Sequence, residues 1–315
     1  MTGAALGLDI GGTKVLGLAV DVATGTVVAE HRVPTPSGSD ALIDVLVGVV
    51  EVLGASSGGV ARSVGVGAAG LVDGAGVLRF GPNLPGVVGL DLVGRLEQRL
   101  GLPVAVDNDA TAAAVAEHRL GAARGVADAV YVALGTGIGG GIVLGGEIRR
   151  GAHGFAGELG HMVIDPGGPL CGCGQRGCWE QLASGSALGE LARGAVADGR
   201  GEGILRHAAG AGVVEGEHAV AAASEGDPGG LAVLDEFARW VAVGLASLVN
   251  LLDPAVIVIG GGVVEAGDLL MRPVRAAFGE LVVGAAHRPE VPIVPAAFGE
   301  HAAAVGAALI GAERT

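Results

Sequence analysis

The chain has 315 residues, half of them apolar, and 33 acidic against 19 basic residues give a formal net charge of −14. This length accommodates two domains, and the acidic balance argues against nucleic-acid binding because it repels phosphate backbones. No uninterrupted apolar run of about 18 residues suggests a membrane span, and the first residues lack the basic segment of a secretion signal, so we expect a cytoplasmic protein without a membrane partner.

The chain opens with three short strand-like segments at residues 5–10, 15–21 and 26–33, which are separated by glycine-containing turns and predict a β-meander. The next predicted elements are a helix at 40–55, a strand at 63–70, a hairpin at 71–80, a helix at 91–101 ended by Gly101, a strand at 103–109 and a helix at 110–123.

Residues 129–148 then repeat the opening pattern of strand, glycine turn (136–141) and strand. Two copies of one unit indicate a duplicated architecture, with a cleft between two lobes at 1–118 and 119–299. The remaining elements are a helix from about Gln181, a polar glycine-rich region at 199–230, a helix at 231–252, a buried strand at 254–262, and a helix at about 300–315 that can pack back on the first lobe.

All three cysteines, Cys171, Cys173 and Cys178, fall within eight residues, ten positions after His161. Three thiolates and one imidazole form a complete ligand set for a tetrahedral structural Zn²⁺, and the intervening glycines allow a tight loop. The alternative is a surface loop with three reduced thiols. Clustering in an otherwise cysteine-free chain favours zinc.

The first glycine turn, Asp9 to Lys14, joins two predicted strands. Gly11 and Gly12 would expose backbone N–H groups to a phosphate, and Thr13 adds a hydroxyl. Asp9 would repel a bare phosphate, so we interpret it as a ligand of a hydrated Mg²⁺ on the phosphoryl oxygens. Lys14 would contact phosphate or only solvent, and a plain hairpin turn is the alternative for the whole segment.

A second glycine turn follows the strand at 129–135. Its candidate nucleotide-binding residues are Gly135, Thr136, Gly137, Gly139 and Gly140. The formal G-x-G-x-x-G match is weak, because a strand rather than a helix follows it. A third turn, at Gly261 and Gly262, could pass under an adenosine. If the two hairpin turns bind the β- and γ-phosphates of one nucleotide, the ligand is ATP.

Polar residues Asp107, Asn108 and Asp109 stand where a strand ends and a helix begins, a common position for functional side chains. One carboxylate there could accept a proton from an attacking hydroxyl, and a helix N-cap is the alternative role. Glu158, His161 and Glu180 lie around the cysteine loop. Such a set suits the fixed hydroxyl pattern of a sugar, although each alone is more often a surface charge.

Five motifs follow one another along nearly the whole chain: DIGGTK at 9–14, PNLPG at 82–86, DNDA at 107–110, LGTGIGGG at 134–141, and GELGH to GCWEQLASG at 157–185. In these motifs the chain resembles the ROK family of sugar kinases and sugar-responsive repressors, and in particular its bacterial glucokinases. The resemblance implies an α/β fold of the two-lobe, actin-like or hexokinase type (ribonuclease H-like).

The resemblance also implies ATP-dependent phosphorylation of the 6-hydroxyl of glucose, with Asp109 as the general base that also contacts the sugar. The other hydroxyls would be held by Asn83, Asn108, Glu158, His161 and Glu180. His161 would serve twice, with one ring nitrogen on zinc and the other facing the sugar, so the metal orients the substrate loop.

Val87 and Thr111 depart from the family pattern, at positions often held by an aromatic residue and an asparagine. His153 lies in a variable position near the predicted site. The alternatives are a kinase for N-acetylmannosamine, N-acetylglucosamine or fructose, or a sugar-sensing regulator; the position of the first motif near residue 9 and the acidic charge disfavour the regulator. A homo-oligomer, dimer or tetramer, is expected.

Overall fold

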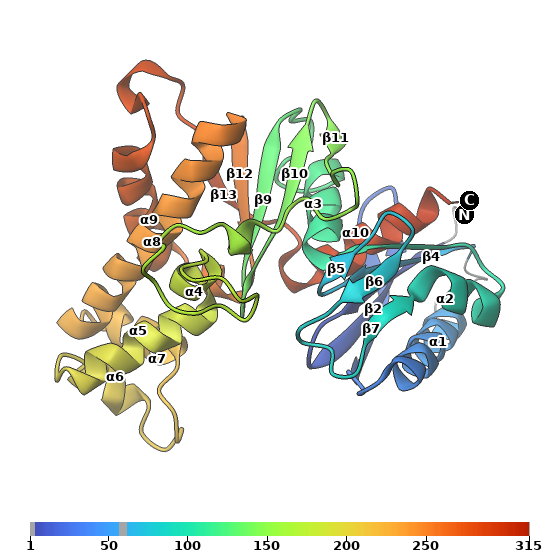
Figure 1. Ribbon diagram of the computed structural model, residues 1–315, viewed down its shortest axis with the longest axis horizontal. Coiled ribbons are helices and arrows are strands. Elements are labelled where there is room, and N and C mark those ends of the chain that lie inside the picture. The colour runs from blue at the N-terminus through green and yellow to red at the C-terminus, as the bar shows by residue number, and fades with distance from the viewer. Residues whose placement is uncertain (1–3, 57–61, 315) are drawn as a thin grey trace. The chain divides into compact units, whose positions relative to one another are not determined.

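The computed structural model describes residues 4–56 and 62–314. The chain forms two compact units, whose segments can be followed in Figure 1 by the colour that runs from the N-terminus to the C-terminus. The first unit contains Met1–Tyr131, Gly140–Gly157 and Ala296–Thr315. The second contains Val132–Gly139 and Glu158–Pro295. The first unit thus includes residues beyond 118 that the sequence analysis assigned to the other lobe. In the described part of the chain, no helix is both long enough and apolar enough to cross a membrane.

A five-stranded sheet with the order β3-β2-β1-β4-β8 forms the centre of the first unit. Its strands are β1 (Ala5–Ile10), β2 (Lys14–Asp21), β3 (Thr26–Pro34), β4 (Val64–Ala68) and β8 (Val104–Asn108). β1, β2 and β3 pair antiparallel, which confirms the predicted meander. β4 pairs parallel to both β1 and β8, so the carboxyl ends of these three strands meet at one edge.

Helices cover both faces of this sheet. One face packs against α1 (Ser39–Ser56) and α2 (Leu92–Leu100), and the other against α3 (Asp109–Arg119) and α10 (Ala302–Ala312). Helix α10 approaches the sheet very closely: a Cβ at Gly65 of β4 would lie only 1.7 Å from the carbonyl oxygen of Ala307. The last helix of the chain is therefore built into the first unit.

The predicted hairpin at 71–80 is confirmed and gains a third strand. β5 (Leu71–Val72) pairs with β6 (Val77–Phe80), which pairs with β7 (Val88–Asp91). Asp91 caps α2 by accepting a hydrogen bond from the Gly94 N–H, and Gly101 ends the helix in the left-handed region at φ 64°.

A second five-stranded sheet has the order β11-β10-β9-β12-β13. Its strands are β9 (Ala129–Leu134), β10 (Ile138–Leu144), β11 (Glu147–Ile148), β12 (Val256–Gly260) and β13 (Ile293–Pro295). Strand for strand, this order repeats that of the first sheet, and the last two strands again pair parallel. The duplication predicted from the repeated pattern is thus present in the topology.

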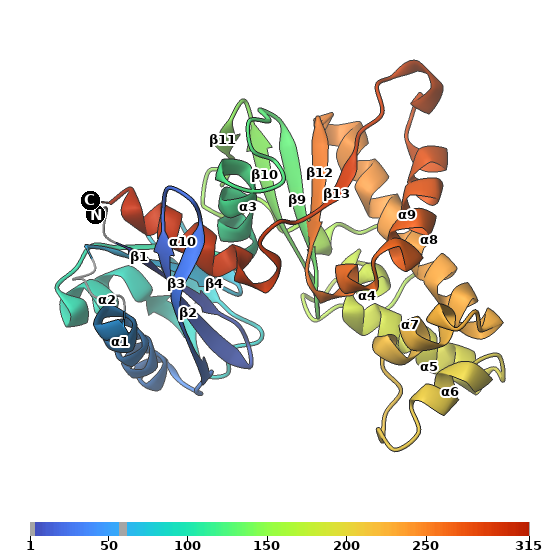
Figure 2. The ribbon, with the colours of Figure 1, turned by 180° about the vertical axis from the view of Figure 1, so that it is seen from behind.

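Most of the described helices belong to the second unit, and Figure 2 shows them from behind. They are α4 (Glu180–Ala183), α5 (Gly185–Ala197), α6 (Glu202–His207), α7 (Gly216–Ser224), α8 (Pro228–Leu252) and α9 (Asp268–Leu281). Short 3₁₀ segments occur at Leu159–His161, Gly262–Ala266 and Ala285–His287, and another at Gly299–His301 precedes α10.

Three expectations need correction here. The region 199–230 contains α6 and α7, because the buried Ile204 of α6 and the buried alanines of α7 lie on helices that contact α8, despite the glycines around them. Helix α8 begins at Pro228 rather than 231, since Asp227 caps it through the Gly230 N–H at 2.9 Å. The helix predicted from Gln181 is two helices, divided at Ser184, whose hydroxyl caps α5.

Candidate active site

In the first unit, the parallel register brings polar strand ends together. Gly67 of β4 stands opposite Asp9 of β1 on one side and Asp107 of β8 on the other. Gly67 also admits the first turn of α3, because a Cβ there would lie 3.3 Å from the Cα of Asp109. Asp9 and Asp109, 100 positions apart in sequence, therefore share one edge of the sheet.

Asn108 is the N-cap of α3, which confirms the alternative role given to this segment in the sequence analysis. Its side-chain oxygen accepts from the Thr111 N–H at 3.0 Å, and its amide donates to the Gly70 carbonyl at 3.2 Å. Asp109 follows as the first helical residue, and its carboxylate accepts from the Ala110 N–H at 2.8 Å. Burial raises the pKa of Asp109 above its ordinary value, against these hydrogen bonds. A carboxylate with a raised pKa is a better proton acceptor.

The pKa of Asp9 is raised to about 7, mainly by burial and also by the charge of Asp109, while Lys14 opposes both effects. Two partly buried carboxylates at one strand edge repel each other unless a proton or a cation intervenes. Their oxygens are the ligands that a hard divalent cation such as Mg²⁺ takes, so the donor set fits the predicted metal.

The first glycine turn is a tight hairpin between β1 and β2. The Gly11 N–H donates to the Lys14 carbonyl at 3.0 Å, and the Thr35 hydroxyl donates to the Gly11 carbonyl at 2.6 Å. A Cβ at Gly12 would lie 2.8 Å from the Cβ of Asn83, so the absence of a side chain brings the PNLPG loop onto the turn. The Lys14 ammonium is paired with Glu300 at 3.0 Å.

The second glycine turn lies in the second unit, where it contacts two other glycine segments. The Gly185 N–H donates to the Gly135 carbonyl at 2.7 Å, and the Ser186 hydroxyl donates to the Thr136 carbonyl at 2.8 Å. Gly261 adopts φ 88°, and a Cβ there would lie 2.3 Å from the Leu134 carbonyl oxygen. Two of the predicted nucleotide-binding segments are thus adjacent.

This turn is shorter than predicted. β10 already begins at Ile138, so Gly139 and Gly140 are strand residues rather than members of a turn over 136–141. The neighbouring glycines allow close packing: a Cβ at Gly141 would lie 2.3 Å from the Cβ of Ala114 in α3, and a Cβ at Gly157 would lie 2.7 Å from the Gly140 carbonyl oxygen. Phosphate contacts by Gly139 and Gly140 stay a prediction.

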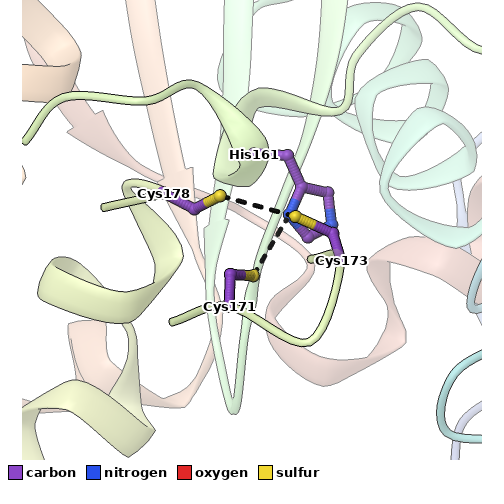
Figure 3. A group of neighbouring side chains, drawn as sticks. All are labelled: His161, Cys171, Cys173 and Cys178. Carbon is purple, nitrogen blue, oxygen red and sulfur yellow. Dashed lines mark hydrogen bonds between the residues drawn. The ribbon is translucent and has the colours of Figure 1, made fainter. Parts of the chain in front are cut away.

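The cysteine loop closes on itself as expected for a metal site. Figure 3 shows the side chains of His161, Cys171, Cys173 and Cys178 converging, and their potential ligand atoms all lie within 4.8 Å of one another. The Cys173 and Cys178 sulfurs are 3.6 Å apart, and the Cys171 sulfur lies 3.7 Å from Nδ1 of His161. Tetrahedral zinc with bonds of about 2.3 Å would place its sulfur ligands about 3.8 Å apart, so the four residues fit Zn²⁺.

His161 points its two ring nitrogens at different partners. Nδ1 faces the Cys171 sulfur, whereas Nε2 lies 4.0 Å from a Glu158 carboxylate oxygen. Both side chains keep more than a third of their surface exposed, at 38% and 36%. The imidazole of His161 therefore links the cysteine cluster to the accessible carboxylate of Glu158. This arrangement is the one expected if one ring nitrogen binds zinc and the other faces the sugar.

The predicted site residues divide between the two units. The first unit contains Asp9, Gly11, Gly12, Thr13, Lys14, Asn83, Asn108, Asp109 and Gly140. The second contains Gly135, Thr136, Gly137, Gly139, Glu158, His161, Cys171, Cys173, Cys178, Glu180, Gly261 and Gly262. Sequence reasoning missed Thr35 and Arg150, which contact the first turn and the β8 end, because their partners lie more than 20 positions away in sequence.

Duplicated sheets, glycine turns and carboxylates at strand ends together define a two-domain sugar kinase. A ROK-family glucokinase from Streptomyces griseus, solved with glucose and AMPPNP, matches this structure with a TM-score of 0.87 and 39% identity, over 99% of this chain and 100% of that chain. The sequence model of the ROK family matches residues 5–314, and the chain belongs to this family.

Two curated relatives extend the comparison. A glucokinase from Streptomyces coelicolor is 41% identical over 317 residues, covering 99% of this chain and 98% of that protein. An N-acetylmannosamine kinase from Escherichia coli O127:H6 is 36% identical over 262 residues, covering 82% of each. The family predicted from the motifs and the α/β sugar-kinase fold are thereby confirmed.

Proposed function

We propose that this protein is a hexose kinase that transfers the γ-phosphoryl group of ATP to the 6-hydroxyl of glucose. The observation that carries the proposal is the pair of partly buried carboxylates, Asp9 and Asp109, at one strand edge beside a glycine hairpin in a ROK-family chain. Relatives that are glucokinases at 41% identity over 99% of the chain support glucose as the substrate.

Asp109 is the proposed general base. Its carboxylate accepts the proton of the 6-hydroxyl while the hydroxyl oxygen forms a bond to the γ-phosphorus and the bond between that phosphorus and the β,γ-bridging oxygen breaks. ADP leaves, and glucose 6-phosphate retains the transferred group. The raised pKa of Asp109 makes this proton transfer more favourable than it would be for an ordinary aspartate.

ATP is the proposed phosphoryl donor. Gly11, Gly12 and Thr13 in the first unit, and Gly135, Thr136 and Gly137 in the second, would present N–H and hydroxyl groups to its phosphates. Gly261 and Gly262 would adjoin the adenosine, and Lys14 is a further candidate phosphate contact. Asp9 would hold Mg²⁺, which neutralises phosphoryl charge.

The remaining polar residues are proposed to bind the sugar. They are Asn83, Asn108, Glu158, His161 and Glu180. Zn²⁺ at Cys171, Cys173, Cys178 and Nδ1 of His161 would have four protein ligands and no open position, which fits a structural role. It would orient His161 and the loop that carries it. A cytoplasmic location and a dimeric or tetrameric assembly stay predictions.

The N-acetylmannosamine kinase relative makes that sugar the second candidate substrate. The two sugars differ at the 2-position and in ring stereochemistry, so the pocket around the sugar decides between them. A coupled assay with ATP and a panel of glucose, N-acetylmannosamine, N-acetylglucosamine and fructose separates the candidates. The proposal predicts the highest kcat/KM on glucose, and a preference for an N-acylated sugar would replace glucose in it.

Asp109→Asn tests the base. Asparagine can keep the hydrogen bond to the Ala110 N–H, so we expect an intact fold but a kcat reduced by about 10² to 10⁴-fold. Glucose binding and zinc content should be unchanged. Asp91→Asn is the matched control, because Asp91 is another helix-starting carboxylate of the first unit and asparagine caps equally well. Near-normal turnover of Asp109→Asn would refute the assignment.

A further inference from the structure

Arg150 forms an ion pair with Asp107, two residues before the proposed base. Its Nε donates to one carboxylate oxygen of Asp107 at 2.7 Å, and the other carboxylate oxygen accepts from the Asn108 N–H at 2.9 Å. The Asp107 carboxylate is thereby bound from two sides. This carboxylate connects the side chain of Arg150, 43 positions away in sequence, to the backbone of Asn108, the residue that caps α3.

The two partners differ sharply in exposure. The Asp107 side chain is 8% exposed and the Arg150 side chain 42%, and both line a cavity of about 280 Å³ beside β8. Burial raises the pKa of Asp107, and Arg150 opposes this effect. Removing the Arg150 guanidinium would leave the buried carboxylate of Asp107 without its cation. This loss destabilises the folded state far more than the loss of an ion pair at the surface does.

Arg150 also begins a loop that is held in place along its length. The Ala156 N–H donates to the Arg150 carbonyl at 3.0 Å, and the Gly74 N–H donates to the His153 carbonyl at 3.3 Å. Gly154, at φ 95°, lies so close to the β5–β6 turn that a Cβ would be 2.8 Å from the Gly74 nitrogen. This loop ends at Gly157, directly before Glu158, a proposed sugar ligand.

We propose that Arg150 is a positioning residue for phosphoryl transfer, which holds both the β8 end before Asp109 and the loop that leads to Glu158. Through Asp107 it restrains the backbone at Asn108, and through its own backbone it anchors the loop. The sequence offers no local signal for this role, because it depends on two segments that meet only in the fold. The inference rests on the proposed function.

The test compares Arg150→Met with Arg149→Met. Arg149 belongs to the same segment, but its guanidinium contacts the Leu144 carbonyl and Glu147 at the surface. We expect Arg150→Met to lower kcat on glucose by about 10²-fold and to raise the KM for glucose, because small displacements of a base are costly. The KM for ATP should change less than twofold, and Arg149→Met should remain within twofold of the parent throughout.

The double variant Asp107→Asn/Arg150→Met provides the rescue. The asparagine that replaces Asp107 can still accept from the Asn108 N–H but carries no charge, so we expect the double variant to recover at least fivefold in kcat over Arg150→Met. Thermal unfolding of each variant separates positioning from stability. A normal kcat per folded molecule in Arg150→Met, or no recovery in the double variant, would overturn the inference; inactivity of the parent on glucose would instead refute the proposed function.

Discussion

The carboxylate of Glu180 accepts a hydrogen bond from the backbone N–H of Ile138 at 2.9 Å, directly after the second glycine turn. Glu180 begins α4 just after Cys178, so this bond ties the end of the cysteine loop to a proposed phosphate-binding segment within the second unit. Gly137 makes the contact possible, since a Cβ there would lie 2.1 Å from the carboxylate oxygen.

Gly137→Ala should therefore displace Glu180 from the turn. We expect kcat/KM for glucose to fall by about tenfold or more, because one precisely placed polar group is lost. Steady-state kinetics with glucose varied at saturating ATP measures the effect. Gly48→Ala in α1 is the control, because a Cβ at that position meets nothing within 4 Å. Unchanged kinetics in Gly137→Ala would show that Glu180 tolerates the displacement.

Asp9→Asn should stabilise the ligand-free protein at neutral and alkaline pH. The pKa of Asp9 is raised from 3.8 to about 7 in the fold, so the folded state keeps a proton that the unfolded chain loses above pH 4. Stability is therefore lost as the pH rises from about 4 to 7, by an amount on the order of 4 kcal/mol. Asparagine removes this loss.

Urea unfolding at pH 4 and pH 8 without ligand measures the Asp9 effect. The variant should exceed the parent in free energy of unfolding at pH 8, and the difference should vanish near pH 4. Millimolar Mg²⁺ should stabilise only the parent at pH 8, since the variant lacks the charged ligand. A difference that is equal at both pH values would contradict the pKa shift as its cause.

Cys173→Ser should abolish zinc binding and weaken glucose binding together. Cys173 is the exposed member of the three cysteines, so its replacement leaves the buried core unchanged. We expect less than one tenth of the parent's zinc by mass spectrometry of the metal and a KM for glucose at least tenfold higher, because His161 loses its anchor. The KM for ATP should stay within twofold. Full zinc content in this variant would exclude the cluster as a zinc site.

Gly65→Ala should destabilise the first unit. Its Cβ would overlap the Ala307 carbonyl oxygen at 1.7 Å, and two backbone segments cannot separate without opening the contact between β4 and α10. We expect a loss of about 3 kcal/mol in the free energy of unfolding. Gly48→Ala should instead gain about 0.5 to 1 kcal/mol, because alanine favours a helix. Equal midpoints in denaturant for the two variants would disprove the close packing.

Many elements of the fold were predictable because their signals are local. Strand-like segments separated by glycine-containing turns predicted the meander of β1, β2 and β3, and Gly101 correctly ended α2. The predictions failed where packing outweighed composition. Residues 199–230 were described only as polar and glycine-rich, yet they form α6, with Ile204 buried, and α7, with three alanines buried, and both helices contact α8.

The candidate site shows the same division. The sequence by itself determined the ligand set of the candidate metal site, since His161 and three cysteines lie within 18 residues of one another, and it determined the family through motifs that stay in order. Only the tertiary structure decided which groups face each other. Asp9 meets Asp109 through the register of β4, and Arg150 meets Asp107, because contacts between distant segments arise from the pairing of strands and the close packing of helices.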